Sequence, residues 1–264
     1  LAHDRRDLAF RFLDAWLSTS GDHDGLPALR YYLVYRALVR ALVARIRAAQ
    51  DGAPAGASAA APRGPDYLGL AQRLEREHDP RLLVTHGLSG SGKSHLSQRL
   101  LEQAGAIRVR SDVERKCMFG LAALHDASAR PGEGIYAADA TQRTYERLLA
   151  QAMHSLDAGY PTIVDATFLH ARERDAFREA ARSRGLPFTI LHCRAEPALL
   201  RERVAARRAG GADASDADLA ILERQLAGHE PLRDDERAAA IEVDTGGPGD
   251  AGALAARWPA PGPA

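Results

Sequence analysis

The sequence predicts an α/β protein of three layers, in which helices cover both faces of a parallel sheet, preceded by an N-terminal helical hairpin. Three observations support this prediction. Short apolar runs alternate with amphipathic stretches from residue 81 onward, a glycine-rich turn follows the first of these runs, and two long helical patterns occupy the first 50 residues. Strands that alternate with helices of this length are typical of a parallel sheet covered on both faces.

Composition and charge narrow the functional classes. The chain has 264 residues, of which 45% are hydrophobic and 27% charged, as expected for one or two globular domains. Lys and Arg number 35, as do Asp and Glu, and this balance disfavours a general nucleic-acid or membrane-surface binder. No apolar run reaches the roughly 18 residues of a membrane span, so no membrane contact is expected. The two cysteines, Cys117 and Cys193, lack metal-ligand spacing and favour a cytoplasmic location.

The N-terminal region is predicted to be helical. Residues 4–18 and 27–49 place leucines and aromatic residues at helical spacing, and a polar loop separates the two stretches. We therefore expect a helical segment over 1–50. Residues 51–65, rich in Gly, Pro and Ala, predict a flexible linker.

The main domain is expected over residues 66–245, followed by a disordered tail from 246 to 264 that is rich in Gly, Pro and Ala. The predicted strands are 81–86, 107–110, 162–167, 188–193 and 240–245. The predicted helices between them include 137–157, 171–183, 196–208 and 216–227.

The glycine-rich turn carries the clearest chemical signal. Residues 87–94 read GLSGSGKS and match the phosphate-binding loop, or P-loop, pattern G-x-x-x-x-G-K-[ST] in full. In this pattern successive backbone N–H groups and a helix N-terminus face phosphate oxygens. The sequence therefore predicts a P-loop NTPase fold that binds ATP with Mg²⁺. The residues expected to bind the nucleotide are Gly87, Leu88, Ser89, Gly90, Ser91, Gly92, Lys93, Ser94 and His95.

Lys93 and Ser94 have specific expected roles. Lys93 is one of only two lysines in the chain, and it falls where the motif requires a compact charge that reaches the β- and γ-phosphates. The Ser94 hydroxyl is the expected Mg²⁺ ligand. Asp165 ends an apolar stretch and is the expected second contact to Mg²⁺ or its water, although an Asp here can also cap the next helix.

Two sequence elements that other classes of P-loop proteins carry are absent, and this narrows the class of P-loop protein. Neither lysine lies in an Asn-Lys-x-Asp element, which disfavours a GTPase. The third predicted strand ends Asp165-Ala166-Thr167 without the Glu that activates water in motor ATPases. The pattern favours phosphoryl transfer over efficient ATP hydrolysis.

Asp112 and Arg115 are candidate catalytic residues. They follow the second predicted strand in RSDVERK, where Asp112 is expected to be the general base and Arg115 to bind the acceptor. A structural alternative is that Ser111 and Glu114 form a capping box and Asp112 merely favours the helix N-terminus.

A basic helix follows the fourth predicted strand. Its arginines are interpreted as part of a mobile lid that stabilises the transferring phosphoryl group, and Arg207 and Arg208 are the candidates nearest the following loop. The alternative is a solvated basic helix face.

These motifs together resemble the small P-loop kinases, the group of polynucleotide kinase, zeta-toxin and gluconate-kinase-like proteins, over about residues 80–245. The resemblance rests on GLSGSGKS, RSDVERK, VDATF and RERVAARR. It implies that Asp112 and Arg115 match the D-x-x-R element of the polynucleotide kinase branch. Phe168 stands where that branch has Asn after D-x-T, a departure that weighs against a polynucleotide acceptor.

The whole chain is similar to bacterial two-part proteins in which an aminoglycoside-phosphotransferase-like domain precedes a P-loop kinase domain. Residues 1–50 resemble the final helices of the first domain, whose catalytic H-x-D-x-x-x-x-N loop is missing. The resemblance implies a contact of residues 1–50 with an upstream domain, or self-association through them.

The sequence thus predicts an ATP-dependent kinase acting on a small-molecule hydroxyl acceptor of unknown identity. Two alternatives are an ATP-dependent regulatory switch with slow hydrolysis and a nucleic-acid end kinase.

Overall fold

The computed structural model describes residues 1–50, 64–121, 138–210, 215, 217–247 and 251–258. A parallel sheet of five strands in the order β2-β3-β1-β4-β5 forms its centre. The strands are β1 (Leu82–His86), β2 (Ile107–Arg110), β3 (Thr162–Asp165), β4 (Phe188–Arg194) and β5 (Ala240–Asp244). The predicted three-layer α/β class and all five predicted strands are confirmed.

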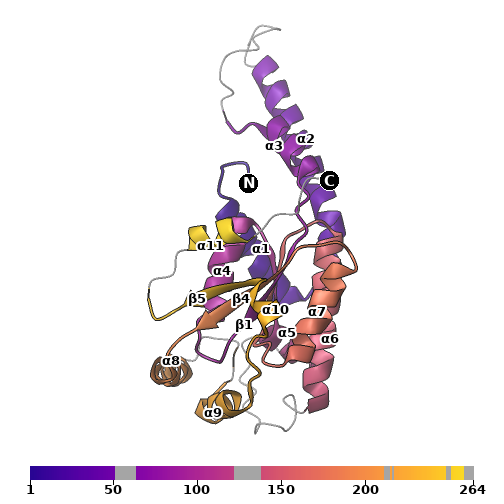
Figure 1. Cartoon of the computed structure of the whole chain (residues 1–264). Coiled ribbons are helices and arrows are strands. Elements are labelled where there is room, and N and C mark those ends of the chain that lie inside the picture. Colours follow the sequence, from indigo (N-terminus) through magenta and orange to yellow (C-terminus); the bar gives the residue numbers. More distant parts are fainter. Residues whose placement is uncertain (51–63, 122–137, 211–214, 216, 248–250, 259–264) are drawn as a thin grey trace.

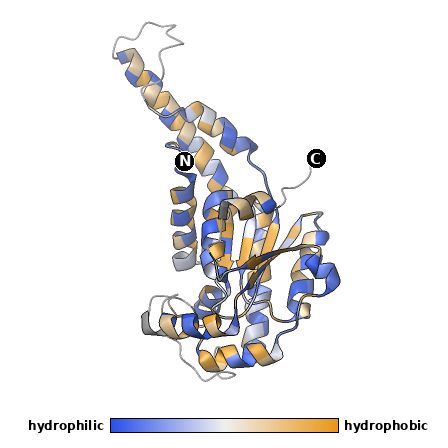
Figure 2. Cartoon of the chain, turned by 60° about the vertical axis from the view of Figure 1, so that its left-hand side comes forward, coloured by the Kyte–Doolittle hydropathy of each residue, from blue (hydrophilic) through white to orange (hydrophobic). Residues whose placement is uncertain are grey.

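The strands are buried on both sides, which explains their continuous apolar runs. Leu83 and Ile163, which are paired in register, face one layer of helices, whereas Leu82, Val84 and Val164 face the other. The first layer contains α1 (Arg6–Ser20), α4 (Lys93–Ala104) and α11 (Ala251–Arg257), and the second contains α6 (Ala138–Asp157) and α7 (Ala171–Arg182). Figure 2 shows the hydrophobic residues of the strands enclosed between these layers.

Three further helices, α5 (Ser111–Met118), α8 (Pro197–Gly210) and α9 (Leu219–Gly228), lie nearer the loops at the carboxyl ends of the strands. The short helix α10 (Asp234–Arg237) directly precedes β5. Helix α5 follows β2 without a break, so that its first turn lies at the sheet edge where β1 and β3 also end.

The two predicted N-terminal helices are present, and each packs on a different part of the molecule. Helix α1 is capped at its C-terminus by Gly21 and buries Phe10 and Leu17 in the core that α4 shares with the sheet. Helix α2 (Leu26–Gln50) packs along α3 (Tyr67–Arg76), and this pair projects from the sheet domain (Figure 1).

Helix α3 is not predicted from the sequence, which assigns the preceding residues to a linker. The Asp66 side chain accepts a hydrogen bond from Gly69 N and begins the helix, and Leu70, Ala71 and Leu74 are buried against α2. Of the predicted linker, residues 51–63 lie outside the described residues.

Helix α2 carries an exposed apolar surface. Its exposed large side chains are Tyr31, Tyr32, Tyr35, Leu38, Leu42 and Ile46. Exposed apolar side chains gathered on one helix differ from the scattered ones of most protein surfaces.

The predicted disordered tail needs a correction. Residues Ala251–Arg257 form α11, which packs on α4. Leu254 and Trp258 are buried in the core, and the Arg81 guanidinium lies 4.5 Å from the centre of the Trp258 ring. A large aromatic side chain buries enough apolar surface to fix a short helix that composition alone does not predict.

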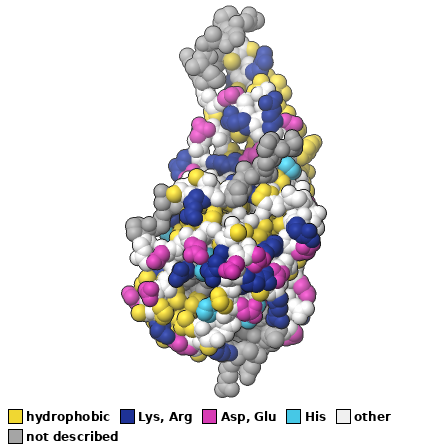
Figure 3. Space-filling view, viewed as in Figure 1, with side chains coloured by type: hydrophobic (Ala, Val, Ile, Leu, Met, Phe, Trp, Pro, Cys, Tyr) yellow, Lys and Arg dark blue, Asp and Glu magenta, His cyan; other side chains and the backbone are white. Residues whose placement is uncertain are grey.

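Within the described part of the chain, every helix is too short or too polar to cross a lipid bilayer. Positive and negative side chains are interspersed on the face in Figure 3. Two surface ion pairs join α7 to α10 and to the residue that precedes α10. They are Arg178–Asp235 and Asp175–Arg233.

Candidate active site

A polar cavity of about 200 Å³ lies at the carboxyl ends of β1, β2 and β3. This is the edge at which open α/β sheets bind ligands. Its lining residues are Ser89, Gly90, Gly92, Lys93, Ser94, His95, Arg110, Ser111, Asp112, Asp165, Ala166, Thr167, Arg203, Arg207 and Ser215.

The P-loop connects β1 to α4 in a conformation that needs glycine. A Cβ on Gly87 would lie 2.4 Å from the Cys193 carbonyl oxygen, and a Cβ on Gly90 would lie 2.8 Å from the Leu200 carbonyl oxygen. Both glycines also have positive φ, 147° and 81°. Backbone from β4 and α8 therefore encloses the loop closely. Gly87, Leu88 and Ser91 belong to the loop but do not line the cavity.

Helix α4 begins at Lys93, so that its N-terminal N–H groups and partial positive charge meet the cavity. The Lys93 Nζ donates to the Leu88 carbonyl oxygen at 2.8 Å. Burial lowers the pKa of Lys93, and the nearby Asp165 carboxylate opposes this effect. A buried ammonium held at the base of the loop is positioned to bind an anion.

Asp165 is buried at the end of β3 and is surrounded by donors. Its Oδ2 accepts a hydrogen bond from the Ser97 hydroxyl at 3.1 Å. The same oxygen lies 3.7 Å from Arg110 Nε and 3.8 Å from an Arg108 guanidinium nitrogen. Sequence reasoning predicted Asp165 but neither arginine.

Asp112 and Arg115 come together as their spacing predicts. An Arg115 guanidinium nitrogen lies 3.8 Å from Asp112 Oδ1 on α5. Asp112 lines the cavity and Arg115 does not. The predicted capping box is wrong, because Arg110 is the N-cap residue and Glu114 is buried against Arg147 of α6. Asp112 does lie in the first turn of α5, as the same alternative expects.

The arginines of α8 divide into distinct groups. Arg201 pairs with Glu223 on the surface, whereas Arg203 and Arg207 line the cavity. Arg203 donates to the Gly90 carbonyl oxygen and to both oxygens of Thr245, with distances of 2.6 to 3.3 Å. The side chain of Arg208 lies outside the described residues. Helical periodicity could have identified Arg203, which is four residues before Arg207 and therefore on the same helix face.

Helix α9 also contacts the P-loop. The Ser89 N–H donates to the Gln225 side-chain oxygen at 2.8 Å, although the two residues lie 136 positions apart in the sequence. No local pattern reveals this contact.

The residues of the cavity fit ATP with Mg²⁺. A loop whose glycines leave no room for a Cβ, a buried Lys and a helix N-terminus form an anion-binding site. Ser94 and Asp165 bring a hydroxyl and a carboxylate to the same cavity, and Mg²⁺ prefers such oxygen ligands. Among the described residues, no group of three or more His, Cys, Asp or Glu could hold a metal by itself.

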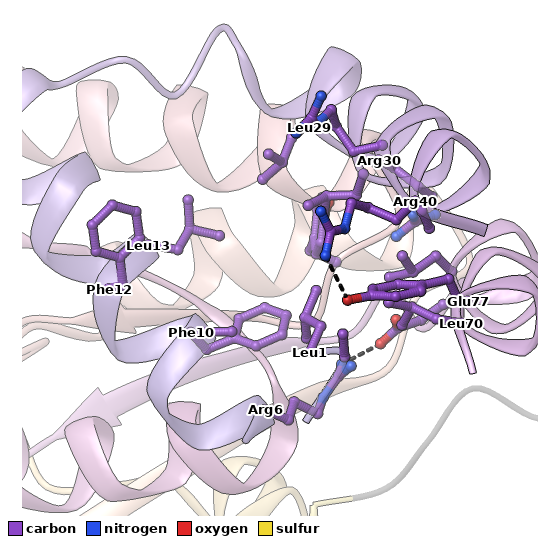
Figure 4. Close-up of a pocket in the computed structure, with 18 residues that line it drawn as sticks. Leu1, Arg6, Phe10, Phe12, Leu13, Leu29, Arg30, Arg40, Leu70 and Glu77 are labelled. Carbon is purple, nitrogen blue, oxygen red and sulfur yellow. Dashed lines mark hydrogen bonds and ion pairs between the residues drawn. The ribbon is translucent and has the colours of Figure 1, made fainter. Parts of the chain in front are cut away.

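A second cavity, of about 400 Å³, lies among α1, α2 and α3. Apolar residues such as Phe10, Leu13 and Leu29 form its wall, and Arg6 points to Glu77 at its rim (Figure 4). Its apolar wall differs from the polar lining of the cavity at the P-loop.

A family model described as an AAA domain matches residues 82–232, which contain the P-loop, Asp112, Asp165 and the α8 arginines. Uncharacterized proteins of Mycobacterium tuberculosis and Mycobacterium bovis are 27% identical to this chain over 211 residues. The match covers 80% of this chain and 41% of each mycobacterial protein, so that more than half of each relative lies outside it.

Solved structures support the fold. A sugar kinase of Janibacter sp. HTCC2649 has a TM-score of 0.50 and 23% identity, and the match covers 67% of this chain and 93% of that protein. A structure from Chloroflexus aurantiacus J-10-fl has a TM-score of 0.51 and 24% identity, with coverage of 68% and 94%. At this identity the similarity establishes the arrangement of strands and helices.

Proposed function

The chain belongs to the AAA domain family, and on that premise we propose that it is an ATP-dependent kinase that transfers the γ-phosphoryl group to a small hydroxyl acceptor. One observation supports this proposal above all others. A single cavity contains the P-loop lysine, a carboxylate on α5, a carboxylate at the end of β3 and two arginines from α8. This set supplies phosphate binding, a base, a metal ligand and charge stabilisation.

The proposed roles follow from position. The loop amides and Lys93 hold the phosphate oxygens, and Ser94 and Asp165 face the divalent cation. Asp112 accepts the proton of the acceptor hydroxyl, because it is a carboxylate in the first turn of α5 that lines the cavity. When bound, ATP with Mg²⁺ supplies the transferable phosphoryl group.

The arginines of α8 complete the proposed site. Arg207 stabilises the charge that develops on the phosphoryl oxygens, and Arg203 holds α8 against the P-loop through Gly90 and Thr245. Arg115 orients Asp112 or contacts a polar group of the acceptor. These residues work mainly by positioning and electrostatics, as in other phosphoryl-transfer enzymes.

The proposal is tested by two variants with different expected effects. Lys93→Ala is expected to lower turnover about 10³-fold, because it removes a buried charge that binds phosphate. Asp112→Asn is expected to leave ATP binding intact and lower transfer about 10²- to 10⁴-fold, because it removes only the base. Asp157→Asn, an exposed surface change, is the control with wild-type behaviour.

The acceptor is found by measuring ADP release with sugars, nucleosides, aminoglycosides and RNA ends as candidate acceptors. Phosphate transfer to one class, lost in Asp112→Asn, is the expected result. Slow ATP hydrolysis that no acceptor accelerates, unchanged in Asp112→Asn, would contradict a kinase and favour a regulatory switch.

A further inference from the structure

Arg108 connects the N-terminal helix to the P-loop side of α4. Its Nε and one terminal nitrogen bind both oxygens of Asp14 on α1, at 3.1 and 2.8 Å. The other terminal nitrogen donates to the Ser94 carbonyl oxygen and to the Ser97 hydroxyl, at 3.1 and 3.2 Å. Gln98 accepts a further bond at 2.6 Å. The guanidinium thus contacts the start of α4 and α1 at once.

This guanidinium is also close to the carboxylate at the end of β3. Arg108 and Asp14 are both buried, and the nitrogen that faces α4 lies 3.8 Å from Asp165 Oδ2. Arg110 lies 3.7 Å from the same oxygen. Asp165 therefore lies beside the guanidinium groups of Arg108 and Arg110, and Asp14 compensates the charge of Arg108.

We propose that Asp14 is a positioning residue for the divalent cation of the active site, acting through Arg108 on Asp165. This inference rests on the proposed function and extends it to a residue outside the matched family region, which begins at residue 82. Helix α1 then contributes a positioning residue, Asp14, to the site.

The physical argument is one of competing charges. Asp14 takes two donors of Arg108 and neutralises its charge, so that Asp165 keeps its negative charge available to a cation. Without the Asp14 carboxylate, the buried guanidinium is left with Asp165 as its nearest carboxylate and competes with Mg²⁺ for it. A purely structural role for Asp14 would not alter the response to Mg²⁺.

The test measures ATP binding by calorimetry in the full chain over a series of Mg²⁺ concentrations. Asp14→Asn is expected to raise the Mg²⁺ concentration needed for half-maximal binding about tenfold or more, the size typical for loss of a partner of a metal ligand. Binding of metal-free ATP should not weaken. Asp7→Asn is the matched control, since Asp7 forms an exposed pair with Arg5 at the start of the same helix.

A double variant separates this proposal from a packing effect. Asp14→Leu with Arg108→Met removes the competing charge together with its partner, so that the Mg²⁺ requirement should return toward that of the wild type. This double variant also gives an answer if Asp14→Asn does not fold. The inference is overturned if Asp14→Asn leaves the Mg²⁺ requirement unchanged. It is also overturned if the double variant needs at least tenfold more Mg²⁺ than the wild type for half-maximal ATP binding. In both cases the proposed function stands. A wild-type chain that binds no ATP at any Mg²⁺ concentration overturns both.

Discussion

Two arginines are buried on opposite sides of the sheet, and each binds both oxygens of a buried carboxylate. Arg108 pairs with Asp14 on the α4 side, and Arg174 pairs with Glu236 on the α7 side at 2.6 and 3.0 Å. The pairs differ in what the remaining donors contact. Arg174 donates to three carbonyl oxygens, of Phe168, Glu230 and Pro231.

This difference shows that burial and ion pairing alone do not determine whether an arginine has a structural or a functional role. The remaining donors of Arg174 bind the segment before α10 to the loop after β3, which is a structural role. The spare donors of Arg108 reach Ser94 and Ser97 beside Asp165, which is a position in the proposed site. Three predictions test this comparison.

The largest effect is expected for Arg174→Met. It takes from the buried Glu236 its closest ion-pair partner, leaving Arg233 Nε at 3.4 Å, and takes a donor from three carbonyl groups. The free energy of unfolding should therefore fall by about 3–5 kcal/mol. ATP affinity of the folded protein should not change. Urea denaturation and calorimetry measure the two quantities. Arg182→Gln on the same helix, which breaks an exposed pair with Glu179, is the control. Weakened ATP binding in Arg174→Met would show that the Arg174–Glu236 pair also affects the site, and would contradict its purely structural role.

A smaller loss is expected when both partners are replaced. Arg174→Met with Glu236→Leu removes the unpaired charge, because a buried ion pair exchanged for apolar groups is often close to neutral. A deficit of about 1–3 kcal/mol should remain from the carbonyl groups that lose their donor. Urea denaturation of the double and single variants gives the difference. A double variant no more stable than Arg174→Met would show that the ion pair itself is not the main contribution.

The smallest effect is expected for Arg11→Gln. Arg11 of α1 pairs with Glu102 of α4, so this contact joins the same two helices that Arg108 joins. The Arg11 side chain is 58% exposed, and such pairs contribute about 0.2–1 kcal/mol. The free energy of unfolding should therefore fall by no more than about 1 kcal/mol. The Mg²⁺ requirement for ATP binding should equal that of the wild type. A shifted Mg²⁺ requirement would mean that any disturbance of α1 reaches the metal side of the site.

Local patterns predicted most of the fold and part of the site. The five strands and the P-loop depend on short apolar runs and on an eight-residue motif, so each is visible within one stretch of sequence. The Asp112 and Arg115 spacing also reports a contact within one helix.

The parts that were missed depend on distant residues. Asp14 and Arg108 lie 94 positions apart, and an Asp on an amphipathic helix gives no sign of its partner. Helix α11 is rich in Ala and Gly, and it is held by burial of Trp258, which the composition of the tail conceals. A run of arginines on α8 does not by itself indicate which helix face meets the cavity. Once Arg207 is placed there, helical spacing adds Arg203, whose bonds to Gly90 and Thr245 the sequence does not reveal.

Helix α4 leaves the P-loop and is covered by α1 from one end of the chain and by α11 from the other. Trimming this protein to the stretch between the first and last strands would remove both α1 and α11 from α4, the helix that begins at Lys93. Such a shortened chain would uncover part of the apolar core that contains Leu96, Leu100 and Leu101 and be prone to aggregate. Minimal versions, fusions and chimaeras of this domain should therefore be cut outside residues 6–258, with both end helices retained.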